Sequence, residues 1–512
     1  MKNDRLKYIY PPLITLVLYS VILAVKGIYP FGGNTIDYYD MAQQIAAFYY
    51  HVFDALHGTK GFFYDWYTAL GTNMAMSTSG CSNISPFNLF FLFIRRSSLL
   101  KSLSVFNGIK LMCMSLSMYF YLDKTHKGSP AFFKLAASVG YSFCGFVLVL
   151  YITNQWVDIA VMFPLIMYFY DKLIKTGKMK GYVITLAVTV IASYYLGFMI
   201  LIFLFLYTGL KLLEGYLFDA VGIPLLECKD EQGGTVQSAA DENSGSENAV
   251  MEDTGNDGTG SAKIEKKGIR DKLSRKKDKV RKARIHKVRK FPDLHLAQLG
   301  IGTLLSLALS SFIVIPQLKQ MLSSARFSNG NKAEGGGIFG AYFAILKHVR
   351  GDYTTRWWTL LGLSFATALI LTGIIRCRKN RRAVFMSVSM ILMMVLELFF
   401  ESINLIWHFG SYIQYPIRNG FIIYFVFAYW MCYFSGRLYD DETAKTNDKF
   451  YLSFIFTVIG FLAFVAFYRN RPGMQLRNVF HITSAIMAAT FVFYFILLNY
   501  ESLKRPLHIV RK

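Results

Sequence analysis

The chain has 512 residues, of which 54% are hydrophobic, 16% are aromatic and only 17% are charged. A soluble domain carries about a quarter charged residues, so this composition excludes an ordinary soluble enzyme and indicates a polytopic membrane protein. The formal net charge is +23, but the basic residues cluster beside apolar segments. We therefore attribute the charge to membrane topology and to contact with anionic lipid, and we expect no nucleic-acid partner.

The first apolar segment covers residues 8–25 and follows basic residues without a small-residue cleavage site, which is typical of a retained signal anchor. The loop that comes next, residues 27–98, is too long to be a simple connector, and long loops often carry function. Asp37, Asp40 and Gln44 lie in this loop at spacings of three and four residues. If the segment is helical, this spacing places all three side chains on one face.

Further membrane helices follow from the rule that about twenty apolar residues cross a hydrocarbon core of about 30 Å. They are predicted at residues 99–122, 131–152, 157–173, 294–315, 357–375, 383–400, 420–433, 450–467 and 479–498. The apolar stretch 181–217 would reach about 55 Å as one helix, so we predict two helices that meet near residues 193–197. The resulting fold class is all-α, with about twelve transmembrane helices and both ends of the chain on one side.

The positions of lysine and arginine support this topology, because these residues are enriched in cytoplasmic loops. Basic clusters at residues 124–127, 172–180, 261–290, 376–382 and 504–512 all fall on the side predicted to be cytoplasmic. The predicted exterior loop after residue 315 also carries cations, including Arg326. For these cations we favour a functional role over an error in the topology.

Three regions are expected on this basis. Residues 1–217 form an N-terminal membrane core that contains the long first exterior loop, and residues 218–292 form a charged cytoplasmic insert. The insert begins with an acidic, Gly- and Ser-rich part that we predict to be disordered. Residues 293–512 form C-terminal membrane helices with exterior loops at 316–356 and 401–419.

Asp40 is the strongest candidate for chemistry. A carboxylate at the outer mouth of a helix bundle can accept a proton from an incoming hydroxyl group. The alternative is an ordinary juxtamembrane acid that caps a helix or contacts water. Asp37 and Gln44 lie beside Asp40, and Trp66 is a candidate for substrate contact in the same loop.

A second candidate site lies at the exterior start of the fourth span. Asp158 is expected about one turn into this span, close to the interfacial Trp156. An acid at that depth is costly unless it faces a cavity or finds a partner. The alternative is that Asp158 stabilises the N-terminus of the helix, and the sequence favours neither reading.

A third candidate site lies between two late spans, on the exterior side. Arg418 can hold a phosphate group through paired hydrogen bonds, whereas the alternative is an arginine that extends toward lipid headgroups. Arg326, in the preceding exterior loop, is a reserve candidate. His408 is a further candidate for substrate binding, although a histidine among aromatic residues is more often structural.

Several common site motifs do not occur in the sequence. It contains no Walker A loop, Rossmann fingerprint, HExxH motif, GxSxG elbow or CxxC metal pattern. Hydrolysis of nucleotides and use of cytosolic nucleotide sugars are therefore disfavoured, and no metal site is assigned, although a need for a divalent cation stays open. What remains is a site on the outer face that acts on membrane-embedded substrates.

A series of motifs covers most of the membrane region. They are Gly27–Gly32, Asp40 with Gln44, Leu70-Gly71, Ser85–Leu89, Trp156–Asp158, Phe163–Leu165, Tyr195–Met199 and, more weakly, Ile406–His408 and Tyr415–Arg418. In this order they resemble the bacterial YfhO-type membrane proteins. The resemblance implies a GT-C-like fold with juxtamembrane helices in the first exterior loop. It also implies sugar transfer from a polyprenyl-phosphate carrier to a cell-envelope polymer such as teichoic acid, on the outer face of the bacterial plasma membrane.

In the wider class, an acidic residue of the first exterior loop is the catalytic base, and Asp40 occupies that position here. The hypothesis is that Asp40 deprotonates the acceptor, while Asp158 orients the acceptor or shares the role of base. Arg418, with Arg326 in reserve, would stabilise the departing lipid phosphate. Aromatic residues of the first loop, Tyr38, Tyr39 and Trp66, would line the cavity where donor and acceptor meet.

Two alternatives stay open: a transporter or flippase of lipid-linked sugars, and a non-enzymatic scaffold for envelope assembly. Transporters tend to place charged groups and broken helices near the bilayer midplane. Lys110 and Glu397 are the main ionisable candidates within spans, and the sequence does not indicate that they pair with each other. Because the acids crowd the outer interface instead, we favour the enzyme.

Overall fold

The computed structural model describes residues 6–37, 40–61, 64–67, 71–73, 84–150, 153–219, 295–323, 363–399, 403, 406–408, 418–439, 492, 494 and 496. The chain divides into two compact units, one of residues 1–214 with 295–512 and one of residues 215–294. Several predictions lie outside the described residues, namely those for Tyr38, Tyr39, Arg326, most of the charged insert and most of the last two spans.

The described elements are almost all helices. The N-terminal part contains η2 (Leu6–Tyr8), α1 (Tyr10–Lys26), the π-helix η3 (Met41–Ile45), α2 (Ala46–Leu56), β1 (Tyr64–Asp65), β2 (Thr72–Asn73), η4 (Pro86–Phe93), η5 (Arg96–Ser98) and α4 (Leu99–Thr125). The helices α5 (Ala131–Ser142), α6 (Gly145–Leu150), α7 (Asn154–Thr176), α8 (Lys180–Ala192), α9 (Tyr194–Asp219), α11 (Leu296–Ser323), α15 (Ser364–Arg376), α16 (Arg381–Phe399) and α18 (Gly420–Leu438) follow. The two short strands pair antiparallel in the first loop.

Six described helical stretches are long and apolar enough to cross a membrane. They are Leu6–Lys26, Arg96–Thr125, Ala131–Leu148, Tyr194–Phe218, Leu296–Lys319 and Gly420–Leu438. Two shorter apolar helices, Lys180–Ala192 and Ser364–Arg376, lie between them in the sequence. The protein is therefore a helical, multi-pass membrane protein, and the total of about twelve spans stays a prediction.

The predicted division of the long apolar stretch into two helices is confirmed. Helix α8 ends at Ala192, Ser193 adopts an extended conformation, and α9 begins at Tyr194. The Ser193 hydroxyl accepts a hydrogen bond from the Leu196 backbone at 3.3 Å. Gly197 allows a close approach, because a Cβ there would lie 3.1 Å from the Val190 side chain.

Three boundaries differ from the sequence-based expectation. The third span is interrupted between α5 and α6, where the Phe143 and Cys144 amides donate to carbonyls three residues earlier. Helix α7 begins at Asn154, three residues before the predicted start at residue 157, so Asp158 lies about one turn into the helix. Helix α11 continues through Pro316 to Ser323, although an exterior loop was predicted from residue 316, because a helix can accommodate proline as a local kink.

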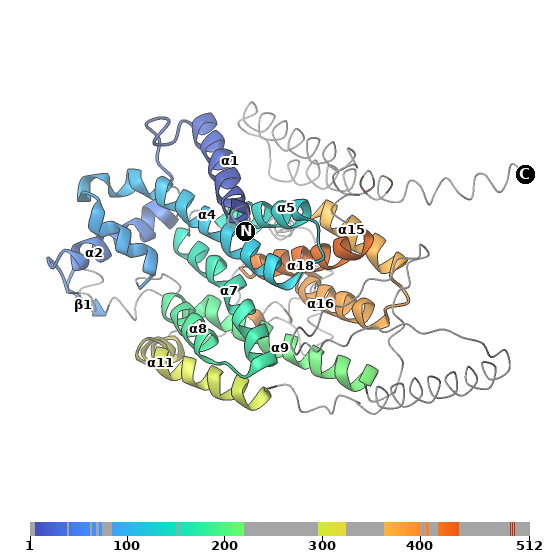
Figure 1. The fold of residues 1–512 in the computed structure, drawn as a ribbon. Coiled ribbons are helices and arrows are strands. Elements are labelled where there is room, and N and C mark those ends of the chain that lie inside the picture. The colour runs from blue at the N-terminus through green and yellow to red at the C-terminus, as the bar shows by residue number, and fades with distance from the viewer. Residues whose placement is uncertain are drawn as a thin grey trace, which may run out of the picture. The chain divides into compact units, whose positions relative to one another are not determined.

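Helix α4 is central to the first unit, where it packs against α1, α5 and α7 (Figure 1). Helix α18 packs against α5, α15 and α16. Aromatic side chains fill the space where α18 meets its neighbours: the Phe425 ring lies 5.0 Å from Tyr121 of α4 and 4.8 Å from Phe163 of α7. Such ring pairs add specific geometry to the burial of apolar area.

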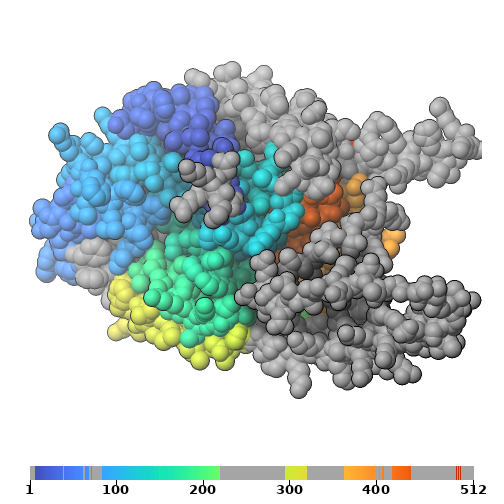
Figure 2. Space-filling model, in the orientation of Figure 1, coloured from blue at the N-terminus to red at the C-terminus, as the bar shows by residue number. Residues whose placement is uncertain are grey.

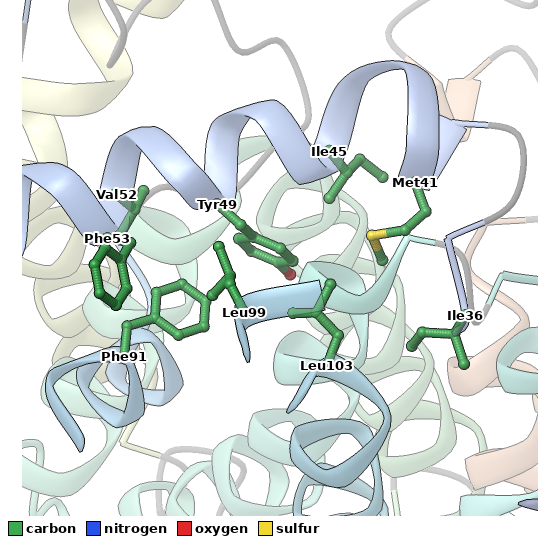
Figure 3. Packing of buried hydrophobic residues seen from close by; sticks show 9 residues of the cluster. All are labelled: Ile36, Met41, Ile45, Tyr49, Val52, Phe53, Phe91, Leu99 and Leu103. Atoms are coloured by element: carbon green, nitrogen blue, oxygen red, sulfur yellow. The ribbon is translucent and has the colours of Figure 1, made fainter. Parts of the chain in front are cut away.

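The first loop is held on the start of α4 by an apolar cluster. Residues at helical spacing on η3 and α2 point toward η4 and the start of α4, where Phe91, Leu99 and Leu103 meet them (Figure 3). The residues of η3 and α2 in this cluster are Met41, Ile45, Tyr49, Val52 and Phe53. In Figure 2 the described first-loop residues, in mid to light blue, lie with the start of α4 at the left of the visible face, beside the darker blue of α1.

The two ends of the bundle can be told apart by their contacts. At one end, which we call the loop end, the starts of α7, α9 and α18 meet one another and the first loop. At the other end, which we call the opposite end, Asp123 at the end of α4 binds Lys7 at 3.0 Å and Lys134 at 3.2 Å. The Tyr8 hydroxyl also donates to Asp123 at 2.7 Å. These bonds join the starts of α1 and α5 to the end of α4.

Candidate functional site

Asp40 lies at the N-terminus of η3, on the exposed side of the helix that the apolar cluster anchors. Burial of Met41 and Ile45 fixes one face of this helix, and Gln44 lies on the exposed side with Asp40. The Asp40 side chain does not cap the helix, which removes one of the two alternatives considered for it. A π-helix at this point is a local irregularity of the kind often found at functional sites.

Asp37 does not share this helix. Asp40 directly precedes η3 as its N-cap residue. Asp37 is a half-buried residue outside the helix, and it accepts a hydrogen bond from the Thr35 hydroxyl. A short-range bond of this type competes with helix formation. The expectation that Asp37, Asp40 and Gln44 share one helical face is therefore wrong for Asp37.

Asp158 forms a buried ion pair that joins α4 to α7. One carboxylate oxygen lies 2.7 Å from Lys110 Nζ, and only 3% and 4% of the two side chains are exposed. The other oxygen accepts a hydrogen bond from the Ser85 hydroxyl of the first loop. Lys110 also donates to the Asn154 carbonyl at 3.2 Å and lies 5.6 Å from the centre of the Phe87 ring. Asp158 is thus a paired internal charge rather than a simple helix cap.

Asn154 lies beside this pair. It precedes Asp158 by four residues on α7, so both side chains lie on the same face of the helix. The residue is 1% exposed, and neither polar atom of its side chain has a hydrogen-bond partner among the described residues. A buried amide without partners is rare in folded proteins and calls for an explanation.

A cationic and aromatic cluster occupies the neighbouring part of the loop end. The Arg418 guanidinium lies 5.1 Å from the Trp156 ring and 5.2 Å from the Tyr195 ring, and it donates to the Tyr195 hydroxyl at 2.9 Å. The buried His408 lies 6.1 Å from Tyr195. Three predicted substrate-binding residues, Trp156, His408 and Arg418, are therefore brought together by Tyr195.

Glu397 and Asn419 support the base of this cluster. The Asn419 amide nitrogen lies 2.8 Å from each carboxylate oxygen of Glu397, and both residues are fully buried. Asn419 directly precedes α18 and follows Arg418, so the contact fixes the backbone from which Arg418 extends.

Within the first loop, Asp54 of α2 and Arg96 of η5 form a paired contact at 2.8 and 3.2 Å. These hydrogen bonds hold the pKa of the Asp54 carboxyl below its usual value. Asp65 lies 3.8 Å from both His51 and Lys60. These contacts organise the loop around the helix that carries Asp40.

Trp66 is 73% exposed, and its ring lies 5.0 Å from Tyr64. Asp158 is bound by Lys110 and Ser85, and Arg418 contacts Trp156. The structure thus gathers Trp156, His408 and Arg418 in one cluster and Asp158 in an ion pair at the same end of the bundle. The first-loop candidates Asp40, Gln44 and Trp66 are exposed.

Sequence reasoning missed the roles of Lys110, Asn154, Ser85 and Tyr195 in these contacts. A usable signal for the ion pair was present, because opposite charges occur in two predicted spans, at Lys110 and Asp158. The described residues include no group of three or more His, Cys, Asp or Glu side chains placed to hold a metal ion.

The family described as "Bacterial membrane protein YfhO" matches residues 12–223 and 282–510. No curated protein matches the chain, and no solved structure matches it. The family match spans most of the chain, including the helices that form the loop end. The protein belongs to the YfhO family of bacterial membrane proteins.

Proposed function

We propose that the protein is a GT-C-type glycosyltransferase that moves a sugar from a polyprenyl-phosphate carrier to a cell-envelope polymer, such as teichoic acid. The reaction would take place on the outer face of the plasma membrane, at the loop end of the bundle. The observation that carries the proposal is the Arg418 cluster, because a cation held between aromatic rings beside apolar helices suits a lipid-linked phosphate.

In the proposed reaction, Asp40 takes the proton of an acceptor hydroxyl group. The acceptor oxygen then forms a bond with the anomeric carbon, and the bond between that carbon and the phosphate oxygen breaks. The electron pair leaves with the lipid phosphate, whose charge Arg418 stabilises. Exposure of Asp40 on an anchored helix supports this role, because a base must reach its substrate.

Asp158 has a different role in this proposal. Its carboxylate is buried, paired with Lys110 and bonded to Ser85, so it is better suited to orient a substrate hydroxyl group than to exchange protons. Trp156 and His408 would border the binding region around Arg418, and Gln44 would assist Asp40. The exposed Trp66 would contact the acceptor from the first loop.

A reconstituted assay tests this function. Wild-type protein in liposomes is given a polyprenyl-phosphate-linked hexose or N-acetylhexosamine together with purified teichoic acid, with and without a divalent cation. We expect sugar to enter the polymer and free polyprenyl phosphate to form in equal amounts. Asp40→Asn should reduce both products at least about 1,000-fold. Equal rates for the variant and the wild type would remove Asp40 from the mechanism.

One observation favours a second function, a transporter of lipid-linked sugars. The Lys110–Asp158 ion pair lies inside the helix bundle, and buried charges within membrane segments often mark transport pathways. Movement of a fluorescent lipid-linked sugar between leaflets, measured without any acceptor, separates the two functions. Protein-dependent movement without transfer would support the transporter, whereas transfer without movement supports the enzyme.

A further inference from the structure

The polar group around Asp158 contains more hydrogen-bonding capacity than the described residues use. One carboxylate oxygen of Asp158 pairs with Lys110, and the other accepts a hydrogen bond from the Ser85 hydroxyl. The Asn154 side chain, one helical turn earlier on the same face of α7, is 1% exposed and has no partner among the described residues. An asparagine amide offers two donors and one acceptor oxygen with two lone pairs.

We infer that Asn154 and Asp158 form a binding site for the hydroxyl groups of a sugar or polyol. The chemistry fits this class of ligand, because each hydroxyl group both donates and accepts hydrogen bonds. Asp158 accepts from one hydroxyl group, while the Asn154 amide donates to and accepts from its neighbours. The inference rests on the proposed function, and it assigns Asn154, which no other observation explains, to substrate recognition.

The contact with Ser85 indicates how a ligand gains access. Ser85 directly precedes η4 of the first loop. The Ser85 hydroxyl donates a hydrogen bond to the Asp158 oxygen that Lys110 does not bind. A ligand hydroxyl can replace it, so that Asp158 keeps a hydrogen bond throughout the exchange. Lys110 acts as a positioning residue, because it fixes the orientation of the carboxylate and binds the Asn154 carbonyl.

The test measures ligand binding without transfer, using thermal unfolding of the full-length protein in detergent. The ligands are a polyprenyl-phosphate-linked hexose and N-acetylhexosamine, the same carrier without sugar, and a glycerol-phosphate oligomer. Stronger binding of a sugar-bearing carrier than of the bare carrier identifies the donor sugar as the ligand. Binding of the oligomer identifies the acceptor instead.

The main variant is Asn154→Leu, which keeps the approximate size of the side chain but removes its hydrogen bonds. We expect the dissociation constant of the recognised ligand to rise about 10-fold to 100-fold. Without ligand, the thermal midpoint should stay the same or rise, because an unsatisfied buried amide has been removed. A midpoint that falls together with unchanged ligand binding would show a structural role and overturn the inference.

Asn107→Leu is the matched control. Asn107 is a buried asparagine on α4 whose amide donates to the Tyr19 hydroxyl at 3.3 Å. Its replacement should lower the thermal midpoint and leave ligand binding unchanged. Ser85→Ala, which removes the competing hydroxyl group, should bind the ligand at least as tightly as the wild type; weaker binding would contradict the exchange of hydroxyl groups.

These outcomes separate the inference from the proposed function. If the wild type transfers sugar but Asn154→Leu binds every ligand as the wild type does, only the inference fails. If the wild type binds a sugar-bearing ligand through Asn154 but transfers nothing, the inference stands and the enzyme does not. Absence of hydroxyl-dependent binding by the wild type contradicts the inference directly.

Discussion

The two ends of the helix bundle hold buried charge in different ways. At the opposite end, Asp123 is bound by Lys7, Lys134 and Tyr8, which join three helices in one network. At the loop end, Asp158 is bound by Lys110 and Ser85, while the neighbouring Asn154 has no partner among the described residues.

The difference bears on what each end does. A buried polar group without a hydrogen bond costs about 1–3 kcal/mol, so a protein optimised only for stability would not retain one. Buried polar groups without hydrogen bonds are expected mainly at functional sites, where binding outweighs stability. The opposite end is therefore interpreted as structural, and the loop end as the place where stability is lowered for the sake of binding.

The largest expected effect comes from breaking the ion pair of the loop end. Lys110→Met leaves the Asp158 charge buried without its cation, which costs about 3–5 kcal/mol. We expect the variant to be nearly lost from the membrane when abundance is measured by immunoblotting. The double variant Lys110→Met/Asp158→Leu should restore abundance but not sugar transfer. Recovery of transfer together with abundance would show that the pair is only structural.

The next effect concerns the cation between the aromatic rings. Arg418→Lys keeps the charge but loses the planar contact with Trp156 and Tyr195. We expect kcat/KM for the lipid-linked donor to fall about 10-fold to 100-fold, equivalent to about 1.4–2.7 kcal/mol, at normal abundance. If the variant instead lowers abundance and keeps kcat/KM, Arg418 serves packing rather than phosphate binding.

A smaller effect is expected at the opposite end, and it is confined to stability. Asp123→Asn removes the charge that Lys7 and Lys134 share, which costs about 1–2 kcal/mol because a neutral amide still accepts hydrogen bonds. The thermal midpoint of the purified protein should fall while transfer per molecule stays unchanged. A fall in transfer per molecule would contradict the interpretation that the opposite end serves stability alone.

The smallest effect is expected for the pair on the surface of the first loop. Arg96 is more than half exposed, so Arg96→Gln should cost no more than about 1 kcal/mol. Arg96 lowers the pKa of Asp54 in the folded protein. The pair therefore stabilises the protein above the unfolded pKa of about 4, and this stabilisation is lost as the pH falls through the lowered pKa. Thermal midpoints of wild type and variant should differ at pH 7 and converge as the pH falls through the lowered pKa of Asp54. A difference that stays constant with pH would exclude this linkage.

The helices could be predicted from the sequence because their cause is local. The apolar stretch 181–217 is too long for one membrane helix, so two helices were expected, and the structure separates them at Ser193. The apolar pattern also predicted a helix that contains Asp158, although it placed the start at residue 157 and α7 begins at Asn154. Asp37 was misplaced because its bond with the nearby Thr35 overrides the helical spacing.

The composition of the site depends on contacts between distant residues, which periodicity does not reveal. Lys110 and Asp158 belong to different helices. Trp156 lies on α7, Tyr195 on α9, and Arg418 just before α18. The sequence marked Trp156, His408 and Arg418 as separate candidates, and the packing of α7, α9 and α18 brings them together. The sequence did not mark Asn154 as a candidate, because asparagine is common at the start of a helix. Only the structure shows that its side chain is buried and has no hydrogen-bond partner among the described residues.

The most direct test of the central claim is envelope decoration in cells that lack this protein. Such cells receive either wild type or Asp40→Asn, at equal abundance in the membrane, and the sugar content of the envelope polymers is measured together with the pool of lipid-linked sugar. We predict that the wild type restores decoration, whereas Asp40→Asn does not and lipid-linked sugar accumulates. Equal restoration by both would contradict the claim that the loop end catalyses sugar transfer with Asp40 as its base.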